Sequence, residues 1–403
     1  PEVYRGLFKL YRAEGRSAEL TDLIDRAWGP PAEGEEPDAE ARRAAADRAR
    51  AMLAALEEEP GLVEELMEAA VREVYQRRRR QSDTWQLMAT LADRTGQLGR
   101  AEVLFREALR GVGPRSEAAV YDGLLRVLWR ANKPAAVAAL CREALEGRPR
   151  ATNLVLFHTH LAMALAELGQ FGEALAQADR AVELSGDGTR LAMRCRKVHV
   201  LRRAGRFADA VAECERMLKE YAEPHEVREV RYALATVYSA ARQYARAEEQ
   251  LRLILDIDPN DATANNDLGY HWADRGVNLA EAERLIRRAI ELDRAQRRSA
   301  PDGEPDNAAF LDSLGWVLFR KGDAAGAREW LEKAAALPEG RDDPVVWDHL
   351  GDVYARLGEP ARAAAAWRKA LELFGQKRRE NTEGRAEEIR RKLGELPPGR
   401  GQQ

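Results

Sequence analysis

Residues 347–354 read WDHLGDVY, and Gly358, Ala363 and Ala370 follow at fixed distances. The same small residues occur one unit earlier, with identical gaps, as Gly315, Gly322, Ala327 and Ala334. They occur once more upstream, with one extra residue before the first alanine, as Gly269, Gly276, Ala282 and Ala289. Chance spacing in an alanine-rich chain could explain one copy but not three, so we interpret the pattern as a structural repeat.

Each residue type in the repeat has a physical reason. The glycine after the leucine has no side chain, so a neighbouring helix can approach its backbone closely. The second glycine falls where a first helix ends, because glycine tolerates the left-handed conformation there. The two alanines lie on one face of a second helix and leave room for helix contact. Asp343 and Pro344 indicate a helix start, with aspartate as the N-cap and proline in the first turn.

This order of Trp347, Leu350, Gly351, Tyr354 and the later small residues resembles the tetratricopeptide repeat family, whose units span about 34 residues. The resemblance implies an all-α fold, an α-solenoid in which helix hairpins stack into a right-handed superhelix. It also implies a concave groove, lined mainly by the first helix of each hairpin, that binds peptides or partner proteins.

Composition agrees with helices throughout. The 403 residues are 45% hydrophobic and 33% charged but only 6% aromatic, and no run of alternating β-branched residues is convincing. The formal net charge of −4 predicts no general attraction to nucleic acid or anionic membranes. No apolar stretch approaches the roughly 20 residues of a membrane-spanning helix. Three cysteines are too few for a disulfide framework, and Cys141 and Cys214 are expected to be buried filler.

The predicted organisation has seven segments. They are a weak N-terminal repeat unit at 1–28, a loop and a divergent helical pair at 29–80, regular units at 83–293, an inserted loop at 294–305, two strong units at 306–373, a linker and capping helix at 376–396, and a disordered tail at 397–403. Because the sequence begins inside a helical pattern, we expect the chain to be truncated at its N-terminus.

Candidate partner-binding residues follow from the family resemblance, which places residues around the first-helix glycine in the groove. They are Arg126, Trp129, Arg130, His199, Arg202, Arg203, Asn266, Tyr270, Asp312, Trp316, Arg320, Asp348, Asp352 and Arg356. The middle of this set is basic, and its C-terminal part mixes aromatic and acidic residues. Arginines could hold acidic groups of a peptide, and exposed aromatic residues are common binding anchors. For any single residue, a solvated charge or a pair with a neighbouring unit is an equally good interpretation.

The sequence predicts no enzyme. His158 and His160 would point to different helix faces, and no metal-ligand, phosphate-loop or nucleophile motif is present. We therefore expect no catalytic residue, no cofactor and no metal. No unit carries the lysine and asparagine pattern with which the family clamps the carboxylates of chaperone tails.

Two alternatives remain beside the peptide-binding scaffold. One is a structural spacer that self-associates as a homo-oligomer. The other is a nucleic-acid adaptor, suggested by basic runs at 77–80 and 377–379, although solvated charge or contact with helix dipoles explains such runs more simply. The high arginine and alanine content suggests a bacterial protein. The sequence leaves the compartment open between the bacterial cytoplasm and the periplasm.

Overall fold

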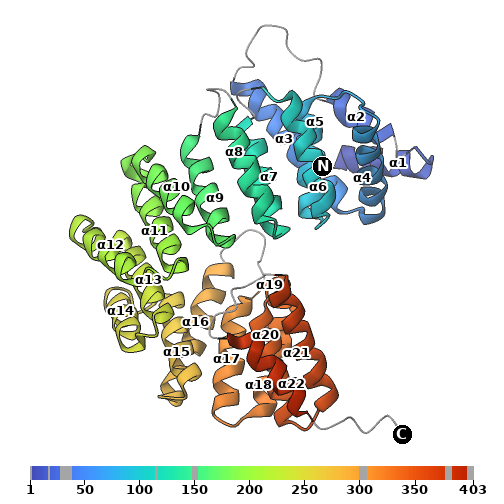
Figure 1. Ribbon diagram of the computed structural model, residues 1–403. Helices are drawn as coiled ribbons and strands as arrows, with labels where there is room; N and C mark the ends of the chain where they lie inside the picture. Colours follow the sequence, from blue (N-terminus) through green and yellow to red (C-terminus); the bar gives the residue numbers. More distant parts are fainter. Residues whose placement is uncertain are drawn as a thin grey trace. The chain divides into compact units, whose positions relative to one another are not determined.

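The structure is a computed structural model and describes residues 2–16, 19–27, 39–113, 117–147, 153–298, 306–376 and 384–396. Within these ranges the chain consists of helices and turns, without a strand. The expected all-α fold, a solenoid of helix hairpins, is confirmed (Figure 1). The chain divides into two compact units, Pro1–Ser185 and Gly186–Gln403, which we call unit 1 and unit 2. Their boundary falls inside the segment 83–293, for which the sequence predicted one regular series of repeats.

Unit 1 is a series of ten helices in its described residues. They are α1 (Glu2–Ala13), α2 (Leu20–Ala27), α3 (Ala39–Glu57), α4 (Pro60–Tyr75), α5 (Ser82–Arg94), α6 (Leu98–Gly111), α7 (Glu117–Arg130), α8 (Pro134–Glu146), α9 (Leu154–Glu167) and α10 (Phe171–Leu184). From α5 onward each helix packs against the next, as expected for stacked hairpins.

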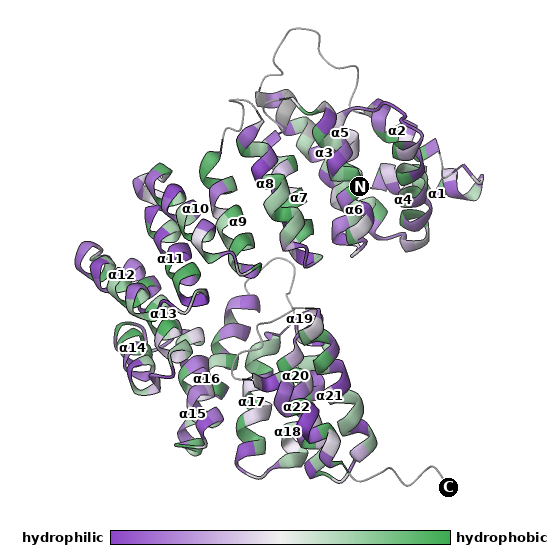
Figure 2. Ribbon diagram, viewed as in Figure 1, coloured by the Kyte–Doolittle hydropathy of each residue, from purple (hydrophilic) through white to green (hydrophobic). Residues whose placement is uncertain are grey.

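Unit 2 repeats this arrangement. Its helices are α11 (Asp187–Arg203), α12 (Phe207–Glu220), α13 (Pro224–Ala240), α14 (Tyr244–Ile257), α15 (Ala262–Arg275), α16 (Leu279–Arg298), α17 (Ala308–Arg320), α18 (Ala324–Ala336), α19 (Pro338–Arg341), α20 (Pro344–Arg356), α21 (Pro360–Gly375) and α22 (Arg385–Glu395). Most helices carry both hydrophobic and hydrophilic residues (Figure 2). The apolar sides meet in a core that runs through the last hairpins and includes Ala386 and Ile389 of α22.

The glycines inside first helices lie where the two helices of a hairpin touch. A Cβ added to Gly315 would lie 2.5 Å from Cγ of Leu331 on the second helix, and one on Gly351 would lie 2.3 Å from the Trp367 ring. A Cβ on Gly269 would lie 2.9 Å from the backbone carbonyl of Ala282. The close approach predicted for these three positions is therefore confirmed.

The turns between paired helices need a left-handed residue. Gly276, Gly322 and Gly358 have φ values of 70°, 95° and 77°, as the sequence predicted. The same turn in two other hairpins uses Asn132 and Arg242, with φ of 53° and 58°. Asparagine tolerates this conformation, but an arginine is strained there.

The inserted loop predicted at 294–305 starts later in the structure. α16 continues through Arg298, so residues 294–298 are helical and not loop. Alanine, glutamine and arginine are good helix formers, and Arg297 pairs with Asp293 one turn earlier at 2.8 Å. The short helix α19 was not predicted. The predicted loops at 29–38 and 299–305 and the predicted disordered tail at 397–403 lie outside the described residues, as does Trp28 of the predicted N-terminal unit.

The three cysteines are free thiols. Cys141 and Cys214 are buried, which confirms the expected packing role, and burial raises the pKa of each thiol to about 12. Burial also raises the pKa of Cys195 to about 11. Because the thiolate is the reactive form, all three cysteines are poor nucleophiles at neutral pH.

Candidate functional site

The first helices of the last three regular hairpins of unit 2 share one face. α15 contacts α17, and α17 contacts α20. On each helix, side chains spaced by about one turn lie on the same side. They are Tyr270 and Asp274 on α15, Asp312, Trp316 and Arg320 on α17, and Asp348, Asp352 and Arg356 on α20. We call this set the first-helix face of unit 2.

The centre of this face is a buried aromatic cluster. The Trp316 ring stacks on His349 of α20, with ring centroids 4.0 Å apart and planes 11° apart. The Tyr270 ring lies beside the same histidine, with ring centroids 6.5 Å apart. Asp312 Oδ1 is 2.9 Å from His349 Nδ1. Trp316 is only 8% exposed. The expectation that it is an exposed anchor is therefore wrong, because its ring is sandwiched within the fold, also against Phe319.

Two arginines border the cluster. The Arg320 guanidinium carbon lies 5.6 Å from the centroid of the Trp316 ring. Arg320 also donates a hydrogen bond to the carbonyl oxygen of Asp274, so it links α17 to α15. Arg356 is exposed and lies 5.2 Å over the Phe319 ring. Of the two, Arg356 is the one presented to solvent.

A lysine from α22 reaches the acidic side of the face. Lys392 Nζ is 3.0 Å from Asp348 Oδ1 and 2.6 Å from Asp352 Oδ1, and it lies 5.8 Å over the Trp367 ring. Burial alone would lower the pKa of Lys392, but the two carboxylates outweigh it and raise the pKa above its ordinary value. Lys392 therefore stays charged and compensates Asp348, which is 4% exposed.

An arginine at the other end of α22 contacts the same face. Arg385 lies 3.6 Å from a carboxylate oxygen of Asp348 and 3.6 Å from one of Asp274, and it donates to the Tyr270 hydroxyl at 3.3 Å. The contact with α15 reaches a hairpin far back in the sequence. α22 therefore does more than cover the end of the last hairpin, the capping role expected for it.

The basic residues predicted on α11 lie together. Arg202 Nη2 is 3.4 Å from His199 Nδ1, and both residues and Arg203 are half-buried. Burial, with a smaller contribution from the charges of Arg202 and Arg203, lowers the pKa of His199 to about 4. His199 is therefore neutral near pH 7, and the arginines carry the positive charge of this surface.

The three candidates in unit 1 have partners within the unit. Arg126 donates to the Asp93 carboxylate at 3.1 Å, and Arg130 donates to the same carboxylate and to the Asp93 carbonyl. Trp129 Nε1 donates to His160 Nδ1 at 2.8 Å. Asp93 is 4% exposed, so the two arginines stabilise a buried charge by pairing with a neighbouring repeat, the alternative that the sequence left open.

Asn266 faces inward. It is 6% exposed and donates to Asp267 Oδ1 at 3.2 Å. The pKa of Asp267 is raised to about 6, because burial outweighs the opposing hydrogen bond from Asn266 and the Asp261 charge adds to the increase. Asn266 thus orients a carboxylate within the fold.

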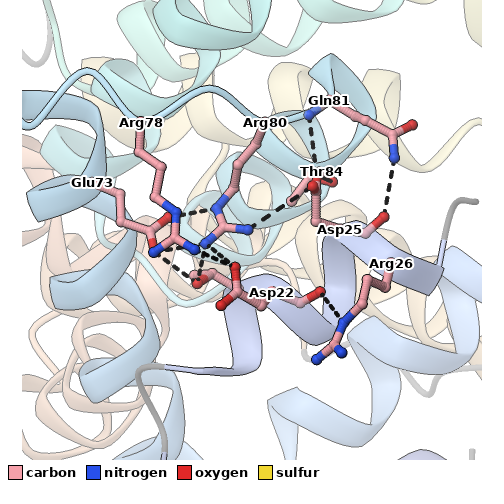
Figure 3. A network of polar contacts seen from close by, with 9 residues as sticks. Asp22, Asp25, Arg26, Glu73, Arg78, Arg80, Gln81 and Thr84 are labelled. Atoms are coloured by element: carbon pink, nitrogen blue, oxygen red, sulfur yellow. Dashed lines mark hydrogen bonds and ion pairs between the residues drawn. The ribbon is translucent and has the colours of Figure 1, made fainter. Parts of the chain in front are cut away.

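Two residues of the basic run at 77–80, Arg78 and Arg80, form part of a polar network in unit 1 (Figure 3). Arg80, whose side chain is 2% exposed, bonds Glu73 at 2.5 Å and Asp22 at 2.8 Å. Arg78 also bonds Asp22, at 2.7 Å. The network links α2 to the end of α4, because the Thr21 hydroxyl of α2 also donates to the Glu73 carboxylate of α4 at 3.0 Å. Solvated charge is therefore the wrong interpretation for Arg80.

Asp25 forms a second set of hydrogen bonds in this network. Its carboxylate accepts from the backbone N–H of Gln81 at 3.0 Å and from the Thr84 hydroxyl at 2.7 Å (Figure 3). These bonds join α2 to the start of α5. The other basic run, 377–379, lies outside the described residues.

Sequence reasoning missed four residues of the unit 2 site, namely Asp274, His349, Arg385 and Lys392. The signal for Asp274 was its position one turn after Tyr270 on the predicted first helix. For Arg385 and Lys392, the signal was a shared helix side with Ile389. Nothing in the local sequence tells which surface that side covers.

No cluster of histidine, cysteine and acidic residues suited to a metal ion is found in the described part of the chain. Among the helices in the described ranges, none is both long and apolar enough to cross a membrane.

Comparison with known families identifies the repeat. Family models described as tetratricopeptide repeat match residues 201–266, 278–344 and 344–376. A TPR repeat-containing protein of Pseudomonas aeruginosa is 34% identical over 135 residues, which are 34% of this chain and 20% of that protein. The chain thus matches only a fifth of the length of this relative.

Solved structures similar to this chain are more distant in sequence. A tetratricopeptide repeat protein from Parabacteroides merdae is 18% identical, with a TM-score of 0.43, over 78% of this chain and 97% of that one. A TPR protein from Thermus thermophilus is 21% identical, with a TM-score of 0.38, over 51% and 98%. MamA from Desulfovibrio magneticus is 18% identical, with a TM-score of 0.35, over 48% and 98%.

Proposed function

Since the chain is a tetratricopeptide repeat protein, we propose that it is a non-catalytic scaffold that binds a peptide or partner protein on the first-helix faces of its repeats. One observation carries the proposal. The first-helix face of unit 2 already holds a helical segment, α22, which contributes Arg385 and Lys392 to Asp274, Asp348 and Asp352. A face that binds one helix from outside its hairpins is suited to bind another.

The remaining candidates extend the proposed surface within unit 2. Arg356 is exposed beside the aromatic cluster, and Arg202 and Arg203 on α11 offer positive charge to acidic groups of a partner. In unit 1, Arg126 and Arg130 keep side chains about half exposed while they share Asp93, so an acidic group could still approach them.

Site-specific photocrosslinking in living cells tests this function. A photoreactive phenylalanine in place of Arg356 should yield a defined covalent adduct with a partner protein. The matched control places the same residue at Arg284, which lies on the second helix α16 with a side chain 66% exposed. Equal adducts at both positions, or none at Arg356, would contradict binding on the first-helix face.

A further inference from the structure

The helix α22 has two sides of different chemistry. Arg385, Ile389 and Lys392 recur at the spacing of one helix side, and Ile389 between the two cations is fully buried in the core of unit 2. This side therefore presents buried Ile389 between two positive charges, with Ala386, Leu393 and Leu396 also packed against the core, and we call it the docking side.

The other side of α22 is satisfied by its own ion pairs. Arg390 pairs with Glu387 at 3.3 Å, and Arg391 pairs with Glu395 at 2.6 Å. All four side chains are about 60% exposed. Arg385 and Lys392 therefore contact the repeats, whereas Arg390 and Arg391 pair with acidic residues of α22 itself.

The surface beneath the docking side is acidic and partly desolvated. Asp348 and Asp352 side chains are 5% and 17% exposed, and both accept the charge of Lys392. A carboxylate held in such surroundings is costly without a cation beside it. When α22 leaves this surface, the two carboxylates lose the charge of Lys392, and a cation from another helix would compensate them in its place.

We propose that the first-helix face of unit 2 binds a partner helix carrying the docking pattern of α22, two cations seven residues apart with an apolar residue between them, and that α22 is the built-in competitor for this site. The inference rests on the function proposed above and specifies its partner. Two cations seven residues apart on a helix span about 10 Å, enough to reach carboxylates on different repeat helices.

Competition by α22 follows from its attachment. α21 ends at Gly375 and α22 begins at Arg385, so the competitor cannot diffuse away. A segment tethered this closely has an effective concentration on the order of millimolar. A partner helix must exceed this competition, which keeps the face closed to weak ligands and open to one that matches the pattern better.

A peptide-binding experiment on the full chain tests the proposal. The probe is a synthetic fluorescent peptide of residues 384–396. The double variant Arg385→Glu, Lys392→Glu repels its own α22 from the acidic face, so it should bind the peptide at least about tenfold more tightly than the wild type does. The control is Arg391→Glu, which reverses a charge on the solvent side and should behave like the wild type.

A second variant guards against misfolding of the first. Ile389→Asp releases α22 through its apolar contact and leaves all of its basic residues in place, and it should gain the same peptide affinity. A peptide with glutamate at the Lys392 position should lose binding to both released variants. Circular dichroism of each chain should show unchanged helix content in the repeats.

The proposal is overturned if neither released variant binds the peptide more tightly than the Arg391→Glu control does, or if the glutamate peptide binds equally well. Failure here is distinguishable from failure of the scaffold function. A partner crosslinked at Arg356 without any peptide effect would retain the function and remove the inference about α22.

Discussion

At the scale of single residues, an absent side chain decides how closely two helices pack. The roles of Gly269, Gly315 and Gly351 could be predicted from sequence because glycine has few other reasons to recur inside helices. The burial of Trp316 could not be predicted, because it depends on His349 from the following hairpin. A residue chosen for its position on one helix can be covered by a neighbour from the next.

Gly315→Ala should destabilise unit 2. The new methyl would lie 2.5 Å from buried Leu331 and 3.1 Å from the Ala327 carbonyl, so the helices must separate, at a cost of about 1–3 kcal/mol. Urea unfolding followed by circular dichroism measures the change. Gly172→Ala is the control, since its added Cβ meets nothing within 4 Å, and it should be neutral or slightly stabilising. Equal losses in both variants would refute the packing argument.

His199 should make stability depend on pH. Its folded pKa is about 4, against an ordinary value of 6.5. Between these values the unfolded chain binds a proton that the folded chain does not, so stability falls as the pH is lowered from about 6.5 to 4. The loss expected from this group is about 2–4 kcal/mol. The stability difference between wild type and His199→Asn, measured by urea unfolding across this range, should shrink toward acid pH; a constant difference would exclude the effect.

At the scale of helices, a local pattern predicts the elements better than their contacts. The helix at 385–396 was predicted from its apolar spacing, and α22 occupies 385–395. Its contact with Asp274 and Tyr270 joins residues more than 100 positions apart in sequence, and no local signal encodes such a pairing. The ion pair of Arg80 with Asp22 on α2 is a second case of the same kind.

The turn between α13 and α14 offers a stabilising substitution. Arg242 has φ of 58° at the position that glycine holds in other hairpins. Arg242→Gly should stabilise unit 2 by about 0.5–1 kcal/mol, because relief of the left-handed strain exceeds the added freedom of the unfolded chain.

The reciprocal change Gly205→Ala provides the control for this turn. Gly205 has φ of 69°, and a Cβ there would meet nothing within 4 Å. Any loss of stability would therefore come from the backbone alone, about 1 kcal/mol. Thermal unfolding should show a higher melting temperature for Arg242→Gly and a lower one for Gly205→Ala. A destabilised Arg242→Gly chain would show that the arginine side chain has an unrecognised role.

At the scale of the whole molecule, the hairpins of each unit pack against their neighbours in the series. In a stacked array, stability is close to a sum of terms for each repeat and for each contact between adjacent repeats. Damage to one hairpin should therefore spread to adjacent hairpins and fade with distance along the array. The repeat pattern made this organisation predictable, while the division after Ser185 had no sequence signal that we recognised.

Leu331→Ala tests this locality. Leu331 is fully buried on α18, so truncation should cost about 2–5 kcal/mol. Hydrogen exchange measured by mass spectrometry should show reduced protection in α17 to α21, with α5 to α10 of unit 1 unchanged. An equal loss of protection in both units would mean that the chain unfolds as one cooperative block.

The unreactive thiols of Cys141, Cys195 and Cys214 make the chain well suited to fluorescent labelling. Since each has a pKa of about 11 or 12, a maleimide dye at pH 7 should prefer a newly introduced, exposed cysteine by a wide margin. A cysteine in place of Arg390, on the solvent side of α22, would carry the dye in an otherwise native chain. Single-molecule fluorescence would then record how often α22 dissociates from the first-helix face of unit 2.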